Sequence, residues 1–333
     1  MKKVLTGLIA SSILVSGVAN AESDKENKGN EDWDKPIFIQ GADLEGNDLE
    51  ETEKELNVKD DYETYKVSVD DVSNYVPSSS NLSYIYSSAT IEKKSFRNGV
   101  DVEIDTPENI TKVTTEQYRN AALTAGIQKA DIHIASIESV TGEGALAGIY
   151  KAYEEKGNSL NQNDIQSANE ELTDISNISE ENEGKDGYSD EGLNASIADI
   201  KKELADIRSK QDEQLTQTQV EDTVNKVLDE RGLSETLNDN QKQIVTKNMT
   251  NVANSKALNE NPKEYYKNAK SVTKDIQGYA SDKLDQAKDK AKQIDNEENK
   301  NILNKFIDGI KSIIDGMISF IQNVLDFFSN LFK

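Results

Sequence analysis

The chain has 333 residues, of which 62 are acidic and 38 basic, so its formal net charge is -24 at pH 7. This charge argues against nucleic-acid binding, because a phosphate backbone must be met by clustered Lys and Arg. With no Cys and a single His, the sequence excludes thiol chemistry, disulfides and His-rich metal sites.

The first 21 residues have the pattern of a secretory signal peptide. Lys2 and Lys3 precede an apolar stretch that is too short for a comfortable transmembrane helix, and Ala19-Asn20-Ala21 offers the small residues that a signal peptidase accepts. We expect cleavage after Ala21 and a secreted or extracellular, envelope-associated protein. Without Cys for a lipid anchor, we expect soluble secretion or non-covalent attachment to the envelope.

The segment 22–40 follows, and it is charged and poor in large apolar residues apart from Trp33 and Ile37-Phe38-Ile39. Such a segment buries too little apolar surface to offset its ordering entropy. The composition therefore predicts an acidic disordered spacer over residues 22–40.

Residues 41–157 alternate between strand and helix patterns and are expected to form an α/β head domain. A short helix is predicted near residues 49–56, and further helices over 114–126 and 142–155. Strands are predicted over residues 88–94, 100–105, 110–113 and 131–137. The main run reads β-β-β-α-β-α, which predicts an α+β fold with a small mixed sheet and helices packed on it.

Local signals support these elements. Asn98-Gly99 tolerates positive φ and predicts a hairpin turn between the first two strands. Thr114 and Gln117 match a capping box, and Gly126 provides a C-terminal stop for the same helix.

Several segments of the head resemble a known family: Tyr75–Ser79, Ser87–Ile91, Asn109–Thr111, Tyr118–Ile127 and Thr141–Glu154. They are similar to the YpuA-like secreted proteins of Gram-positive bacteria, domain of unknown function 1002. The resemblance is specific from Gly41 to Glu155 and looser to about Leu258. It implies an exported protein with no established activity, and it supplies no catalytic residues.

Candidate binding residues in the head are Ser78, Ser87, His133, Thr141, Gly142 and Gly144. The motif Gly142-x-Gly144-x-x-Ala147 lies between a strand and a helix, where a dinucleotide fingerprint would lie, but Glu143 would place a carboxylate beside the phosphates. Small residues for close helix–sheet packing are the favoured interpretation.

His133 lies in the middle of a strand, on the face opposite Ile132 and Ile134. A general base is one interpretation, and a structural or surface histidine is the favoured one, since no motif places a nucleophile near it. The serine clusters around Ser78 and Ser87 have no Lys or His at nucleophile spacing.

No cofactor and no metal site is predicted. A partial calcium-loop pattern runs from Asn182 to Asp190, but its third position is Gly184 and its twelfth is Leu193. Two of the oxygen ligands that such a loop requires are therefore missing.

Residues 158–300 have a helical period throughout and are expected to form a bundle or elongated stalk. Apolar residues at four-three spacing predict a short coiled-coil-like seam at Leu193, Ile197, Ile200, Leu204 and Ile207. Asn238 with Gln241 marks one helix start, and Pro262 marks another.

Residues 301–333 are predicted to form an amphipathic C-terminal helix. Its proposed contact residues for a membrane or a partner are Phe306, Ile310, Ile314, Met317, Phe320, Ile321, Phe328 and Leu331. Asp315 and Asp326 argue against a membrane span. Two interpretations remain open: contact with a membrane surface or envelope partner, and burial by self-association or packing on the bundle.

The sequence as a whole favours an exported, non-catalytic, envelope-associated binding or structural protein of unknown ligand, attached through its C-terminal helix. The alternative is an extracellular small-ligand-binding protein or enzyme that acts through the head. The expected partner is a cell envelope component or membrane surface, with self-association as a further option.

Overall fold

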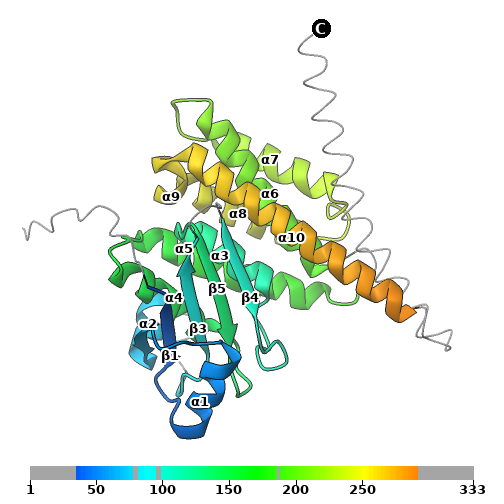
Figure 1. Ribbon diagram of the computed structural model, residues 1–333. Helices are drawn as coiled ribbons and strands as arrows, with labels where there is room; N and C mark the ends of the chain where they lie inside the picture. Colours follow the sequence, from blue (N-terminus) through cyan, green and yellow to red (C-terminus); the bar gives the residue numbers. More distant parts are fainter. Residues whose placement is uncertain (1–34, 78–81, 95–98, 186–187, 292–333) are drawn as a thin grey trace, which may run out of the picture.

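A computed structural model of the protein describes residues 35–77, 82–94, 99–185 and 188–291. The predicted signal peptide, Ser78 and the predicted helix 301–333 lie outside these residues. Within them, the α+β class is confirmed: a five-stranded mixed sheet with packed helices is followed by a helical region. The sheet lies at one end of the molecule and helices α6 to α10 gather at the other (Figure 1).

The elements of the head are β1 (Ile37–Gly41), α1 (Gly46–Glu55), β2 (Glu63–Val67), α2 (Val69–Tyr75), β3 (Ser88–Lys93), β4 (Val100–Ile104), α3 (Thr115–Ala125), β5 (Ala130–Ala135) and α4 (Glu143–Glu155). The strand order is β2-β1-β3-β5-β4. The pairs β1/β2 and β4/β5 are parallel, and the pairs β1/β3 and β3/β5 are antiparallel.

Strand β1 corrects the end of the disordered spacer predicted over residues 22–40, of which residues 22–34 lie outside the described ranges. Every residue of β1 is buried, and the strand lies between β2 and β3. Ile37 and Ile39 belong to the main core, whereas Phe38 packs with Leu56 on the other side of the sheet. Both faces are thus covered by segments distant in sequence, which local composition does not reveal. The edge strand β2 was not predicted either.

Two further predictions about the sheet are wrong. Strands β3 and β4 do not form a hairpin, because β5 lies between them and pairs with both. Residues 110–113 do not form a strand; they contribute one isolated bridge, from Ile110 to Val140. Ile110 and Val113 are nevertheless buried, so their apolar character reflects core packing rather than sheet pairing.

The predicted helix caps, which depend only on neighbouring residues, are confirmed. Thr114 and Gln117 form a reciprocal capping box, and Gly126 ends α3 in the left-handed conformation with φ of 90°. Asn238 and Gln241 form the same kind of box at another helix start. Each cap satisfies backbone N–H groups that would otherwise lack a partner.

The two faces of the sheet are covered differently. Helices α3 and α4 pack on the inner face, where Ile37, Ile91 and Ile132 meet in the main core. Helix α1 and the chain that follows it lie against the outer face, around Phe38, Leu56 and Ala135. The outer face is only partly covered, so that Glu92 and Glu103 are exposed and Asp131 and His133 are half-buried, whereas Thr90 is buried.

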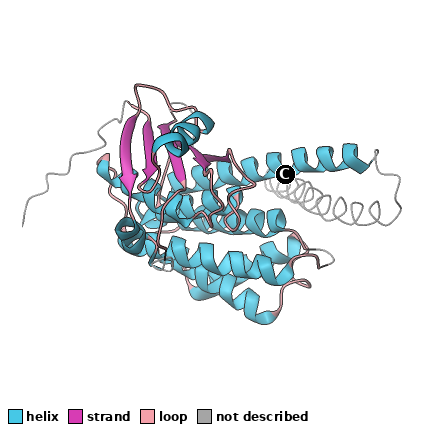
Figure 2. Cartoon of the chain, turned by 90° about the horizontal axis from the view of Figure 1, so that it is seen from below, coloured by secondary structure: helices cyan, strands magenta, loops and turns pink. Residues whose placement is uncertain are grey.

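The helical region consists of α5 (Gln162–Asn182), α6 (Asp190–Ser209), α7 (Gln217–Glu230), α8 (Asp239–Asn254), α9 (Lys256–Glu260) and α10 (Pro262–Ala291). Its helices pack beside one another and against the head (Figure 2). Helix α5 contributes Ile165 and Leu172 to the head core and Ile175 and Ile178 to a second core. Residues 157–158 are the predicted boundary between the head and the helical region, and α5 packs into the cores on both sides of it. The described helices therefore form a bundle rather than a stalk. Within the described ranges, no helix is both long enough and apolar enough to cross a membrane.

Candidate functional site

The outer face of the sheet carries the one histidine of the chain among carboxylates. Strand pairing places Thr90 beside His133 and His133 beside Glu103. One step along the strands, Glu92 lies beside Asp131 and Asp131 beside Asp101. Side chains alternate between the two faces of a strand, so the polar residues gather on this outer face while Ile91, Ile132 and Val102 point into the core on the inner face.

His133 is held by a carboxylate that follows β4. Its Nδ1 lies 3.1 Å from Oδ1 and 3.2 Å from Oδ2 of Asp105. Its Nε2 lies 4.0 Å from Oδ1 of Asp131. The side chain is 37% exposed, so the ring is both oriented and accessible to solvent.

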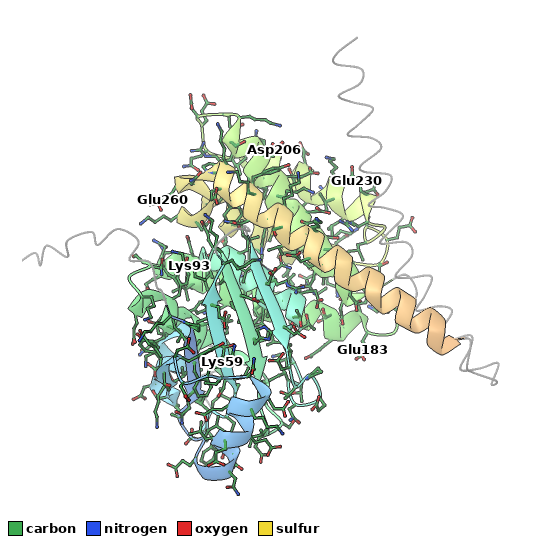
Figure 3. All side chains as sticks on the ribbon, in the orientation of Figure 1. Lys59, Lys93, Glu183, Asp206, Glu230 and Glu260 are labelled. Carbon is green, nitrogen blue, oxygen red and sulfur yellow. The ribbon has the colours of Figure 1, made fainter. Side chains whose placement is uncertain are left out.

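A cleft of about 270 Å³ opens beside the ring. The strands contribute Thr90, Glu92, Asp131 and His133 to its wall, and Asp105 follows β4. The opposite wall comes from the end of α1 and the chain leading to β2, and is made of Glu55, Leu56, Asn57, Lys59 and Tyr62. Lys59 lies at the end of the sheet beside α1 (Figure 3).

The second wall is anchored at two points. Leu56 packs on Phe38 and Ala135 beneath it. The hydroxyl of Tyr62 donates a short hydrogen bond to Oε1 of Glu92 on β3. These contacts fix the wall against the strands, so that the cleft has a defined shape.

The electrostatics of the cleft favour positive charge. The hydrogen bond with Asp105 raises the pKa of His133, and nearby carboxylates add to this effect. Burial raises the pKa of Asp131, an effect that His133 opposes. Four lining residues are carboxylates, Glu55, Glu92, Asp105 and Asp131, against one lysine and the histidine.

The raised pKa of His133 predicts a pH-dependent stability. The protonated ring stabilises the folded state fully below the unfolded pKa of about 6.5, and this contribution is lost as pH rises through the higher folded-state pKa. The variant His133→Gln should therefore be less stable than the wild type in mild acid, with a difference that shrinks in alkaline solution. Urea unfolding of both proteins across pH measures it, and a pH-independent difference would contradict the prediction.

Glu103, Asp105 and His133 could together hold a cation. Each offers one ligand atom, and these atoms lie within 4.8 Å of one another. Imidazole with carboxylate is a ligand set that suits first-row transition metals more than calcium.

A larger hollow, of about 640 Å³, lies between the head and α9 and is lined in part by Gly126, Tyr153 and Asp164. The carboxylate of Asp164 accepts hydrogen bonds from the backbone N–H groups of Lys256 and Ala257. It thereby joins α9 to α5. Because this carboxylate is already used in packing, we consider the smaller cleft the better candidate for a ligand.

The structure separates the residues predicted from the sequence. His133 faces the outer side of the sheet, whereas Ser87 and Gly144 meet at the inner side, where a Cβ on Gly144 would lie 2.7 Å from Oγ of Ser87. Gly142 has φ of 109°, and its carbonyl accepts a hydrogen bond of 2.6 Å from Tyr118. The glycines thus serve close packing, and Thr141 is exposed next to them.

The partners of His133 were not predicted as site residues. Asp101, Glu103 and Asp105 alternate with apolar residues, and this signal places them on a wet face. It does not say that β4 lies beside β5, nor that Tyr62 closes the cleft. Those neighbours follow only from strand order and from the path of the chain after α1.

The model of a family described as protein of unknown function DUF1002 matches residues 40–272. The chain belongs to the DUF1002 family. The match runs beyond Leu258, where the resemblance in sequence motifs was expected to end, and it includes the start of α10.

The DUF1002 match agrees with a relative in Bacillus subtilis (strain 168), the uncharacterized protein YpuA. It is 30% identical over 236 residues, which cover 66% of this chain and 78% of the relative. No solved structure matches the chain. Family membership therefore leaves activity to be argued from the site.

Proposed function

We propose that this DUF1002 protein is an exported, non-catalytic binding protein whose head takes a positively charged ligand group in the cleft around His133. The observation that supports this proposal is the cleft itself, which combines a formed volume with carboxylates from both of its walls. A cation entering it gains attraction from Glu92, Asp105 and Asp131, and partial burial weakens the screening by water.

The single histidine makes the test specific. In full mature protein prepared without a histidine tag, ring-labelled His133 gives one set of NMR signals. Zinc chloride and ethylammonium chloride serve as separate probes, the first for a metal ion and the second for an ammonium group. We expect saturable displacement of the ring signals by at least one probe, and no displacement by either at millimolar concentration would refute the proposal.

A matched pair of variants controls for general charge. Asp131→Asn removes a carboxylate from the cleft, whereas Glu213→Gln removes the same charge from an exposed turn before α7. Ethylammonium binding should weaken about tenfold or more in the first variant, as expected for loss of one charged contact. Equal ethylammonium binding by the two variants would show that the ammonium group does not enter the cleft.

Attachment to the envelope forms the second part of the proposal and rests on the apolar pattern of residues 301–333. Deletion of residues 302–333 is expected to move the protein from the cells to the medium. Co-sedimentation of full-length and shortened protein with liposomes and with isolated cell wall identifies the surface that is bound. Unchanged partitioning would contradict attachment through this segment.

The alternative is that the head acts as an enzyme or small-ligand receptor. The pair of Asp105 and His133 favours it, because a carboxylate that orients an imidazole is a common arrangement for a general base. Ser87 lies toward the opposite side of the sheet and so gives this base no nucleophile. If His133→Asn and Glu143→Gln leave an envelope phenotype unchanged, neither residue is required for activity, and the enzyme alternative is contradicted at its two strongest candidate residues.

A further inference from the structure

Three side chains of complementary chemistry meet in the interior where the head joins the bundle. Asn120 of α3, Glu171 of α5 and Lys201 of α6 are 2%, 2% and 0% exposed. A fully buried lysine is rare, because removing an ammonium group from water is costly unless partners compensate for it.

The contacts place the amine of Lys201 between a carboxylate and an amide. Its Nζ lies 2.6 Å from Oε1 of Glu171. It also lies 2.9 Å from the backbone oxygen of Asn120 and 3.4 Å from the side-chain Oδ1 of the same residue. The electrophilic carbonyl carbon Cγ is bonded to Oδ1, so it is one bond away from an atom that the amine contacts.

The carboxylate and the amide are both held in place. Oε2 of Glu171 accepts a hydrogen bond of 2.9 Å from the hydroxyl of Thr124. Nδ2 of Asn120 donates a hydrogen bond of 3.0 Å to the backbone oxygen of Asn194 on α6. The carboxylate of Glu171 and the amide of Asn120 are therefore already oriented toward the amine. Fixed contact of this kind strongly raises the effective concentration of reacting groups.

Burial also favours the protonation states that amide chemistry needs. It raises the pKa of Glu171 and lowers the pKa of Lys201, although the attraction between the two groups opposes both shifts. These directions favour transfer of a proton from the ammonium to the carboxylate. The result is a neutral amine, which is the nucleophilic form of lysine.

We propose that Lys201 and Asn120 react to form an intramolecular isopeptide bond, with Glu171 as the proton-transfer group. Nζ of Lys201 attacks Cγ of Asn120, the Cγ–Nδ2 bond breaks, and ammonia leaves. Of the three protons on the lysine ammonium, one passes to Glu171, one goes to the leaving nitrogen, and one stays on the new amide. Ammonia takes the proton from Glu171 and departs as ammonium, so no oxidant, metal or other reactant is needed.

The bond would join α3 of the head to α6 of the bundle across a separation of 81 positions. A cross-link over a long loop stabilises a fold by restricting its unfolded chain. In a chain without Cys, it would provide the kind of covalent staple that disulfides give other exported proteins.

Intact-mass spectrometry of the full mature wild-type chain tests the proposal. We expect a mass lower by one ammonia molecule than the sequence requires, and a branched peptide that joins Asn120 to Lys201 after proteolysis. A wild-type chain at its full sequence mass, with separate Asn120 and Lys201 peptides, would overturn the proposal whatever the variants do.

Variants assign the roles of the three residues. Asn120→Ala and Lys201→Met should restore the full mass, whereas Lys202→Met, at the neighbouring lysine that pairs with Asp199, should keep the loss. Glu171→Gln should leave the chain unlinked because the proton acceptor is gone. A branched peptide formed at the wild-type rate in Glu171→Gln would overturn the role given to Glu171.

Discussion

The variant Lys201→Met is expected to be about 3–5 kcal/mol less stable than Asn120→Ala, because it leaves the carboxylate of Glu171 buried without its cationic partner. Asn120→Ala is the reference because it keeps the ion pair of Lys201 with Glu171 but cannot form the isopeptide bond. Glu171 is 2% exposed and keeps only the hydroxyl of Thr124 as a donor. Its pKa, already raised by burial, should rise further, so the variant should lose more stability at neutral than at acidic pH. Urea unfolding followed by circular dichroism measures both effects.

The double variant Lys201→Met with Glu171→Leu separates the cost of an unpaired charge from the loss of packing. It removes both ions and fills the space with apolar atoms, so it should recover most of the lost stability. Neither the single nor the double variant can form the isopeptide bond, and their comparison is therefore independent of that bond. A double variant no more stable than the single variant would contradict this explanation.

Features of the fold that depend on a few neighbouring residues could be predicted from the sequence. The capping box of Thr114 with Gln117 and the left-handed Gly126 need only local hydrogen bonds, and both are present. The hairpin at Asn98-Gly99 fails for the opposite reason. A turn dipeptide permits a hairpin, but six residue pairs between β3 and β5 decide the actual strand order.

Strand β1 shows how composition can mislead. Ile37, Phe38 and Ile39 are three apolar residues next to a charged segment, and alone they could not bury enough surface to become ordered. In the fold they are 0–1% exposed because helices cover both of their faces. The order of this segment is supplied by residues outside it, namely Leu56, the neighbouring strands β2 and β3, and helix α4.

In the candidate site, too, local sequence predicts the direction of a side chain but not its neighbours from distant segments. The alternation around His133 correctly predicts that its side chain faces away from Ile132 and Ile134, because side chains alternate along any strand. Strand order brings Asp105 to the histidine, and the path of the chain between α1 and β2 brings Tyr62 to the same cleft. No spacing within β5 contains that information.

For the helical region, the sequence predicted the spacing of the apolar residues but not which helices would pack against one another. Of the five residues at four-three spacing, Leu193, Ile197, Ile200 and Leu204 are buried, and Ile207 is partly buried. A two-stranded coiled coil would bury them against one helix. Instead α6 packs against α3, α7, α8 and α10, so its apolar stripe forms the centre of a bundle.

Replacement of Gly148 by valine is expected to destabilise the head by about 3 kcal/mol, at the upper end of typical costs for overpacking a core. Gly148 lets α4 approach the sheet so closely that an added Cβ would overlap Cγ2 of Ile39 and lie 2.7 Å from Cγ2 of Val67. Both neighbours are fully buried, β-branched residues on adjacent strands, so neither can rotate away freely. Gly148→Ala should cost less, because it adds one carbon and gains about 1 kcal/mol of helix propensity.

Glu155→Val, at an exposed position of α4, is the matched control and should change stability by less than about 1 kcal/mol. Near-equal unfolding midpoints for Gly148→Val and Glu155→Val would show that α4 does not press on β1 and β2 as closely as these contacts require.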